Sequence, residues 1–385
     1  MNPMHGGHVA IVGASETTQI GRLPDMSVVD LHVEAAYNAL ADAGLTAAVV
    51  DGVANDYFPA YEISDHLGIR PRWIDGTAVG GCSSMLHVRH AAAAIAAGAA
   101  NVVMISHGES GRSRVGTPPK PRDPSSTAGQ FEEPFGAVAP YSTFTTPAMA
   151  FMSERGFDRS ALAEVVVAQR EWAQRNPRAL RRDQLTVDDV LSGPPIAYPF
   201  TRDMCCVVTD GGGALILTTA ERARDLPSAD RAVYLLGSGE ATGSAIVSQM
   251  DDLGSFEAFR AASSAAFRTA NVSHADVDHV MFYDAFAHLP LYMLEDTGFV
   301  ARGESAGFIM DGHTRPGGSL PMNTNGGGLS YTHTGKYGMF AILEAVRQLR
   351  GEAAAQVPDV ELSFVQGVGK MFGAAGSLVL SSKRP

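Results

Sequence analysis

Two stretches of sequence, AAYNALADAGLTAAVVDGV at residues 35–53 and ASSAAFRTANVSHADVDHV at residues 262–280, decide the fold. Aligned without gaps at an offset of 227 residues, they pair Ala35 with Ala262, Leu40 with Phe267, and Val53 with Val280. In each stretch a helical pattern is followed by a short turn and a Val-Asp-x-Val segment that leads into a strand. A helix–strand unit repeated at this distance predicts two similar α/β halves packed together.

The segments around this repeat predict the remaining elements. Buried strands are expected at residues 8–15, 49–53, 101–106, 205–218 and 360–365. Helices are expected from the cap Ser27 to Gly44, over 82–97 and over 336–350. Residues 111–146 are rich in Gly, Pro, Ser, Thr and charge, which is typical of a loop excursion, and helices follow near 146–153 and 160–175.

Composition and charge limit the class of protein. The 385 residues carry a formal net charge of −12, and 45% of them are hydrophobic. This hydrophobic fraction allows a large core, and the negative charge argues against nucleic acid or an anionic membrane as the main partner. The three cysteines form no disulfide framework, no spacing suggests a metal site, and the apolar tract 91–100 is too short to span a bilayer. We therefore expect a cytoplasmic protein without a metal.

The glycine-rich segment NTNGGGLSYTHTGKYG at residues 323–338 is the strongest candidate site. Gly326, Gly327 and Gly328 would let the backbone approach a substrate. The segment precedes a helix, whose N-terminus favours an anion or a developing oxyanion. His333 could hold or protonate such an oxygen. The alternative is a tight structural turn with a histidine that faces solvent.

Two further segments place reactive side chains at the ends of elements. Cys82 begins the helix over 82–97, where a helix N-terminus favours a thiolate nucleophile, although a small buried core residue is the alternative. Tyr283 and Asp284 end the strand HVMFYD, at the sheet edge where α/β proteins place their sites. Cys205 and Cys206 begin an apolar strand and are expected in the core.

Taken together, these segments resemble the thiolase superfamily, and within it the non-specific lipid-transfer-protein, or sterol-carrier-protein, type of thiolase. The resemblance extends over nearly the whole chain and is carried by VAIVGASETTQIGR, GGCSSMLHVRHAAAAIAAGAANVVMISHGES, CCVVTDGGGALIL, YDAFAHLPLYMLEDTGFVARGES and GGSLPMNTNGGGLSYTHTGKYGMF. It implies an α/β fold of two similar βαβαβαββ halves in a five-layer α-β-α-β-α arrangement. Residues 1–110 with 200–222 would form the first half, 111–199 an inserted loop domain, and 223–385 the second half.

The resemblance also implies roles for individual residues. The family's Gly-His-Pro motif appears as Thr-His-Thr, which keeps His333 in the oxyanion-hole position. The family's Asn-Glu-Ala-Phe motif appears as Tyr-Asp-Ala-Phe, so Tyr283 stands where the family has asparagine. Gln366 falls near the family's C-terminal acid/base. An ungapped count places the nucleophilic cysteine of the family on Gly81, one residue before Cys82.

These matches and departures leave three functions open. The first is a thiolase-like acyltransferase acting through Cys82, His333 and Tyr283, with a CoA thioester as substrate and no cofactor. The second is a CoA-thioester retro-aldolase of the steroid side-chain type. The third is a non-catalytic scaffold that binds lipid or acyl-CoA. The candidates for moving a proton are Tyr283, Tyr331, Tyr337 and Asp284.

The resemblance further implies an assembly. The family is typically dimeric, and we expect a homodimer joined through the apolar strand 101–106, because an open edge strand invites pairing. Relatives of the retro-aldolase kind act with a small partner that carries a zinc ribbon and an OB-fold. Such a partner is therefore expected if the second function holds.

Overall fold

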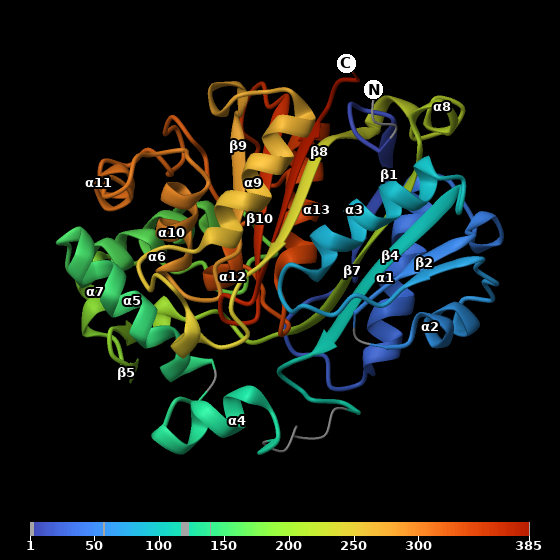
Figure 1. Ribbon diagram of the computed structural model, residues 1–385. Helices are drawn as coiled ribbons and strands as arrows, with labels where there is room; N and C mark the ends of the chain where they lie inside the picture. Colours follow the sequence, from blue (N-terminus) through green and yellow to red (C-terminus); the bar gives the residue numbers. More distant parts are fainter. Residues whose placement is uncertain (1–3, 57, 117–122, 139, 385) are drawn as a thin grey trace.

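The computed structural model describes residues 4–56, 58–116, 123–138 and 140–384, and a nine-stranded sheet forms its framework (Figure 1). The sheet order is β3-β2-β4-β7-β1-β8-β11-β10-β9. The first half contains β1 (Val9–Glu16), β2 (Gly52–Ala54), β3 (Trp73–Asp75), β4 (Val102–Ser110) and β7 (Asp210–Thr219). The second half contains β8 (Val233–Thr242), β9 (His279–Phe282), β10 (Leu362–Gly369) and β11 (Ala374–Ser381). The two halves meet where Ala10 and Ile11 of β1 pair with β8.

The sequence repeat corresponds to a structural repeat. The order β2-β4-β7-β1 in the first half is matched by β9-β10-β11-β8 in the second. Helices α1 (Val28–Ala43) and α9 (Glu257–Ala270) occupy equivalent places, and Leu40 and Phe267 are buried at equivalent positions within them. The prediction of two similar α/β halves is therefore confirmed.

The helices and sheets form the expected five layers. Helices α3 (Ser83–Ala96) and α13 (Gly338–Arg350) contact each other between the two halves of the sheet, while α1 and α9 pack on its outer faces (Figure 1). Helix α1 begins with a capping box between Ser27 and Asp30 and ends at Gly44 in the left-handed conformation, with φ of 67°. Local sequence therefore sets both ends of this helix.

Several details differ from the sequence-based expectation. Residues 47–49 form a 3-10 turn, so the second strand begins only at Gly52. The strand expected from Cys205 begins at Asp210, and Cys205 itself makes an isolated bridge with Phe286. Strand β4 lies between β2 and β7, so its hydrogen-bonding groups are used within the chain. The expected pairing of two copies through residues 101–106 is therefore wrong, because the sheet ends at β3 and β9 instead.

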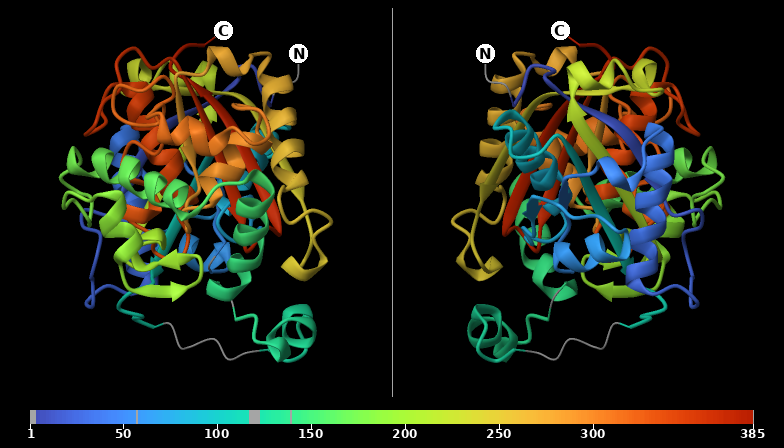
Figure 2. Two further views of the ribbon diagram at one scale, coloured as in Figure 1. Left: turned by 90° about the vertical axis from the view of Figure 1, so that its left-hand side faces the viewer. Right: turned by 90° about the vertical axis from the view of Figure 1, so that its right-hand side faces the viewer.

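The chain between β4 and β7 is more helical than its composition indicates. It forms α4 (Thr127–Phe131), α5 (Tyr141–Arg155), α6 (Arg159–Gln174), α7 (Val187–Ser192) and the small sheet of β5 (Pro195–Ala197) and β6 (Phe200–Thr201). Helix α4 stands apart from the body in both views of Figure 2. The expected excursion over 111–146 therefore contains α4 and the first turns of α5, while 117–122 and 139 lie outside the described residues. The three proposed domain boundaries remain a prediction.

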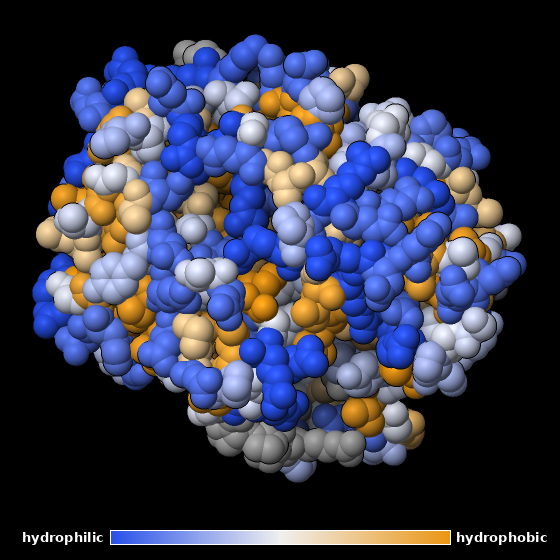
Figure 3. All heavy atoms as spheres, turned by 180° about the vertical axis from the view of Figure 1, so that it is seen from behind, coloured by the Kyte–Doolittle hydropathy of each residue, from blue (hydrophilic) through white to orange (hydrophobic). Residues whose placement is uncertain are grey.

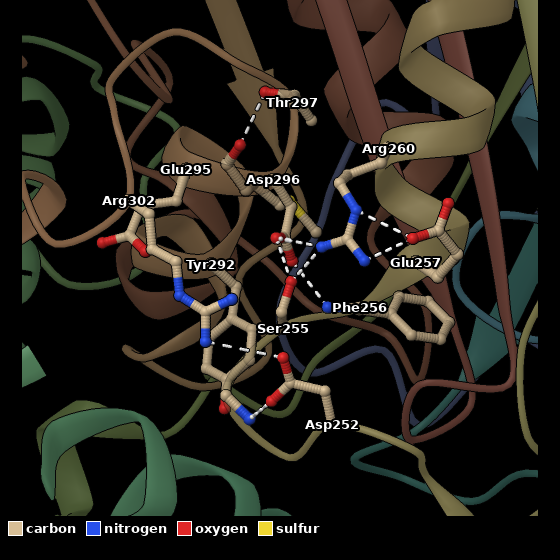
Figure 4. A network of polar contacts seen from close by, with 12 residues as sticks. Asp252, Ser255, Phe256, Glu257, Arg260, Tyr292, Glu295, Asp296, Thr297 and Arg302 are labelled. Atoms are coloured by element: carbon tan, nitrogen blue, oxygen red, sulfur yellow. Dashed lines mark hydrogen bonds and ion pairs between the residues drawn. The ribbon is translucent and has the colours of Figure 1, made fainter. Parts of the chain in front are cut away.

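Polar contacts tie the inserted helices to the second half, which has a polar network of its own around Arg260 and Asp296 (Figure 4). Arg155 of α5 pairs with Glu295 of α10 (Leu289–Asp296) at 2.8 Å. The hydroxyl group of Tyr292 lies 2.7 Å from a carbonyl oxygen of α5. Asp296 accepts a hydrogen bond from Arg260 of α9 at 3.0 Å. The contacts of Arg155 and Tyr292 fix α5 against the second half.

The face shown in Figure 3 is mostly hydrophilic, and its apolar residues occur in small groups. In the part of the chain that the structure describes, no helix is both long and apolar enough to cross a membrane.

Candidate active site

Residues from both halves and from the inserted segment line a cavity of about 690 Å³. Its lining comes from the end of β4, the start of α5, the irregular segment 205–208 and the loop that carries His333. The backbone of Thr209 donates a hydrogen bond to the carbonyl of His333, and the backbone N–H of His333 donates to the hydroxyl of Thr209. These paired contacts hold the histidine loop against the segment that precedes β7.

His333 and Tyr283 meet at this cavity. His333 lines the cavity. Tyr283 does not, but its hydroxyl oxygen lies 2.9 Å from His333 Nε2. Burial lowers the pKa of His333 to about 4, so its imidazole is neutral at pH 7. Burial, with nearby negative groups, raises the pKa of Tyr283 well above its usual value, so its phenol stays protonated. The structure thus brings two predicted residues together as a neutral, hydrogen-bonded pair.

Cys82 does not join this pair. It is fully buried at the start of α3, and burial raises the pKa of its thiol far above the usual value. A Cβ built on Gly369 would lie 3.0 Å from its Sγ, so the thiol faces β10. A Cβ built on Gly81 would instead lie 2.3 Å from the ring of Tyr283. The position that faces the site is therefore a glycine, and the tyrosine ring occupies the space of a side chain there.

The glycine-rich segment has a role different from the expected one. Gly326 precedes the short helix α12 (Gly327–Ser330), and the N–H groups of Gly328 and Leu329 donate to the carboxylate of Asp284 at 2.7 and 3.3 Å. A Cβ on Gly327 would lie 2.1 Å from Asp284 Oδ2. Burial raises the pKa of Asp284 to about 7. These glycines make room for a buried carboxyl group, and neither they nor Asp284 line the cavity.

The two other candidate tyrosines point elsewhere. Tyr331 donates its hydroxyl to Glu16 at 2.5 Å, within an ion cluster that includes Arg347. Tyr337 donates to the side-chain oxygen of Asn325 at 2.7 Å. Burial raises the pKa of both phenols, and neither side chain lines the cavity. Their geometry therefore supports a structural role and not proton transfer with a substrate.

The remaining family positions also depart from thiolase chemistry. Gln366 accepts a hydrogen bond from Ser377 at 2.5 Å and cannot act as an acid or base. Cys205 belongs to the hydrophobic core and Cys206 packs against it, as expected, and both also line the cavity. Burial raises the pKa of Cys205 to about 12 and that of Cys206 further, which keeps both thiols protonated. They form part of the apolar wall.

Sequence reasoning missed a charged cluster beside His333. Glu109, at the end of β4, lines the cavity and lies 3.1 Å from Lys336 Nζ. The same ammonium group lies 2.7 Å from Asp56. A carboxylate just after the buried strand of residues 101–106 was a signal for Glu109. Its association with Asp56 and Lys336 has no local signature, because the three residues are far apart in the sequence.

Sequence reasoning also missed a set of basic residues in the lining of the cavity. Arg181 and Arg202 line the cavity and share the carboxylate of Asp203, at 3.1 and 3.3 Å. The apolar wall is formed by Phe286 together with Tyr141, Ile196 and Val208. The cavity can therefore receive a molecule with an anionic end and a bulky apolar end.

Known proteins share this architecture. A family described as thiolase C-terminal domain-like matches residues 239–382. The acetyl-CoA acetyltransferase of Methanothermobacter thermautotrophicus is 32% identical over 97% of this chain and 99% of its own length. The steroid side-chain-cleaving aldolase of Thermomonospora curvata is 31% identical over 92% of this chain and 93% of its own length. The solved "Ltp2-ChsH2(DUF35) aldolase" superposes with a TM-score of 0.90 at 30% identity, covering 97% of this chain and 98% of that one.

Proposed function

This chain belongs to the thiolase superfamily, in its sterol-carrier-protein branch, and on that basis we propose that it cleaves a carbon–carbon bond next to a CoA thioester by retro-aldol chemistry. The single observation that supports this choice is the close approach of the Tyr283 ring to Gly81, the position at which the family's nucleophilic cysteine is expected. The ring of Tyr283 fills the place of a nucleophilic side chain, and Cys82 faces away. A retro-aldol reaction forms no acyl-enzyme and needs no such nucleophile.

The neutral pair of His333 and Tyr283 suits the developing oxyanion of this reaction. As the carbon–carbon bond breaks, negative charge moves onto the thioester oxygen as an enolate forms. Hydrogen-bond donors already fixed at that oxygen stabilise the charge without reorganisation. His333 borders the cavity, and Tyr283 orients its ring from behind. The hydroxyl group of Thr209 accepts a hydrogen bond from the backbone N–H of His333 and so fixes the backbone of that residue.

We propose a bulky apolar acyl group as the substrate class, of the steroid side-chain type. The wall around Phe286 would pack against the acyl group, and Arg181 and Arg202 would face the phosphate groups of CoA. The steroid side-chain-cleaving relative at 31% identity supports this class. Thiolase-like acyl transfer is the second candidate, supported by the acetyltransferase relative at 32% identity.

We further propose a cytoplasmic homodimer that binds a small zinc-ribbon/OB-fold protein. The "Ltp2-ChsH2(DUF35) aldolase" supports a partner of this kind. Strand β3 ends the sheet on the side of the first half and, unlike β4, leaves one edge for pairing with a second copy. Light scattering of the chain alone, and co-purification with a co-expressed zinc-ribbon protein, would test both associations.

One experiment separates the candidate functions. A polycyclic β-hydroxyacyl-CoA would be incubated with the protein, with and without the partner, and the products followed by mass spectrometry. We expect a ketone and a shortened acyl-CoA, no adduct on Cys82, and little effect of Cys82→Ser. His333→Ala should lower the rate on the order of 100-fold or more. An acyl adduct on Cys82, together with loss of turnover in Cys82→Ser, would establish the thiolase mechanism instead. Binding without turnover would indicate a scaffold.

A further inference from the structure

We propose that Glu109 is the general base of this reaction and takes the proton of the substrate's β-hydroxyl group. This inference rests on the proposed retro-aldol function and names the general base that the reaction needs. Glu109 lies at the end of β4 and lines the same cavity as His333. Of the described residues that line this cavity, it is the only carboxylate.

The carboxylate of Glu109 is held at a fixed place in the wall. Lys336 Nζ lies 3.1 Å from its Oε1, and its Oε2 faces Gly335. A Cβ built on Gly335 would come within 1.8 Å of Oε2, so a larger residue there would displace the carboxylate. Glu109 also acts electrostatically on Tyr283, as one of the charges that raise the pKa of that phenol. The carboxylate is therefore near the His333–Tyr283 pair.

Lys336 links Glu109 to a second carboxylate, that of Asp56. Lys336 is shared by two carboxylates, those of Glu109 and Asp56, and both outweigh burial in raising the pKa of its ammonium group. Burial alone would raise the pKa of Asp56, but Lys336 outweighs it and keeps Asp56 ionised. Three neighbouring histidines, His32, His87 and His107, have pKa values lowered by burial and are neutral.

Glu109 is the carboxylate of this cluster that a substrate can reach. It lines the cavity, whereas Asp56 does not. Two carboxylates that share one ammonium group repel each other, which favours transfer of a proton from the substrate to the carboxylate within its reach. The proton would therefore arrive at Glu109.

The other groups at the cavity are poor proton acceptors. The pKa of His333 is lowered to about 4, and its Nε2 already contacts the Tyr283 hydroxyl. Burial raises the pKa of Tyr283 and of both Cys205 and Cys206, so these groups hold their protons. A general base needs an oxygen or nitrogen acceptor within reach of the hydroxyl proton. Of the described residues that line the cavity, Glu109 alone offers a carboxylate as that acceptor.

The step balances without an added reactant. Glu109 removes the hydroxyl proton, the oxygen lone pair forms the carbonyl group, and the Cα–Cβ bond breaks. Its electron pair passes into the thioester enolate. The proton on Glu109 is then available to the α-carbon, which completes the shortened acyl-CoA and restores the carboxylate. No electron is gained or lost overall.

The test compares Glu109→Gln with Asp56→Asn in otherwise intact protein. Glu109→Gln should lower kcat on the order of 10²- to 10⁴-fold while CoA binding stays within about twofold, because the lost group is a base and not a binding contact. Asp56→Asn removes the other negative charge, so the acidic limb of the pH–rate profile should move to lower pH with activity retained at neutral pH. Glu221→Gln, at an exposed ion pair with Arg384, is the matched control and should leave the rate unchanged.

Near wild-type turnover in Glu109→Gln would overturn the assignment. Equal losses in Glu109→Gln and Asp56→Asn with an unshifted pH profile would also overturn it, since that result indicates a purely structural cluster. If the wild-type protein cleaves no β-hydroxyacyl-CoA, the proposed function fails separately. Infrared spectra during acid titration then still decide about Glu109: a carboxylic acid band that is absent in Glu109→Gln supports a proton acceptor, and no difference between the proteins refutes it.

Discussion

Gly81→Ala tests the claim that the Tyr283 ring has replaced a side chain at the start of α3. An added Cβ would lie 2.3 and 2.4 Å from two ring atoms of Tyr283 and 2.6 Å from the carbonyl oxygen of Val368. All three distances are well below ordinary van der Waals contact, so either the ring or the backbone must move. A shift of the ring would carry the Tyr283 hydroxyl away from its place 2.9 Å from His333 Nε2.

The expected cost follows from the kinds of atom involved. Overpacking in a filled interior costs about 1–3 kcal/mol, and a backbone atom among the contacts places Gly81→Ala near 3 kcal/mol. In a Tyr283→Ala background the two ring contacts vanish and the Val368 contact remains, so the same change should cost about 1 kcal/mol. The double-mutant cycle should therefore give a coupling energy of about 2 kcal/mol between positions 81 and 283.

Urea unfolding of the wild type, the two single variants and the double variant measures this coupling. Steady-state turnover measures how far the displacement of Tyr283 from His333 impairs catalysis. Gly307→Ala is the control, because its added Cβ in α11 (Ser305–Met310) meets no atom within 4 Å. That variant should be neutral or slightly more stable. A Gly81→Ala protein with unchanged stability and turnover would show that the site has room for a side chain there. The case against a nucleophile at this position would then fail.

Three further changes probe other contacts of the site. Tyr331→Phe should reduce the free energy of unfolding by about 2 kcal/mol, since the buried carboxylate of Glu16 loses a donor; chemical denaturation checks this. Asp284 has a folded-state pKa of about 7, above its usual 3.8, so its contribution to stability should fall as pH rises from about 4 to 7. Asp284→Asn should remove that fall from a series of unfolding curves. Arg181→Ala should raise KM for the CoA thioester more than it lowers kcat, which initial rates at varied substrate would show.

The repeated architecture was predictable because its signals are local. Ser27 and Gly44 mark both ends of α1, and the burial of Leu40 and Phe267 follows from helical spacing alone. The order of strands was less accessible. Strand β3 has only three residues and no clear alternation, so the true edge of the sheet was missed and β4 was taken for it.

The site was harder to predict because it depends on where each side chain points, and a residue's place in the sequence does not give that direction. Gly81 and Cys82 are neighbours in the turn before α3, yet Gly81 lies against the ring of Tyr283 while the Cys82 thiol faces Gly369 of β10. The sequence offers a cysteine within one residue of the family position, but it does not show which way the thiol points. The contact of Lys336 with both Glu109 and Asp56 likewise depends on the neighbouring strands β4 and β2, which only the tertiary structure shows.

The two sides of the cavity are secured by separate sets of contacts. The histidine loop is held by Thr209, whereas α5 is held to α10 by the contacts of its Arg155 with Glu295 and of its backbone with Tyr292. Substitutions in the inserted segment that accumulate during evolution can therefore reshape the apolar wall without disturbing the position of His333. Descendants of one ancestral gene could in this way acquire different acyl groups while keeping a single chemistry.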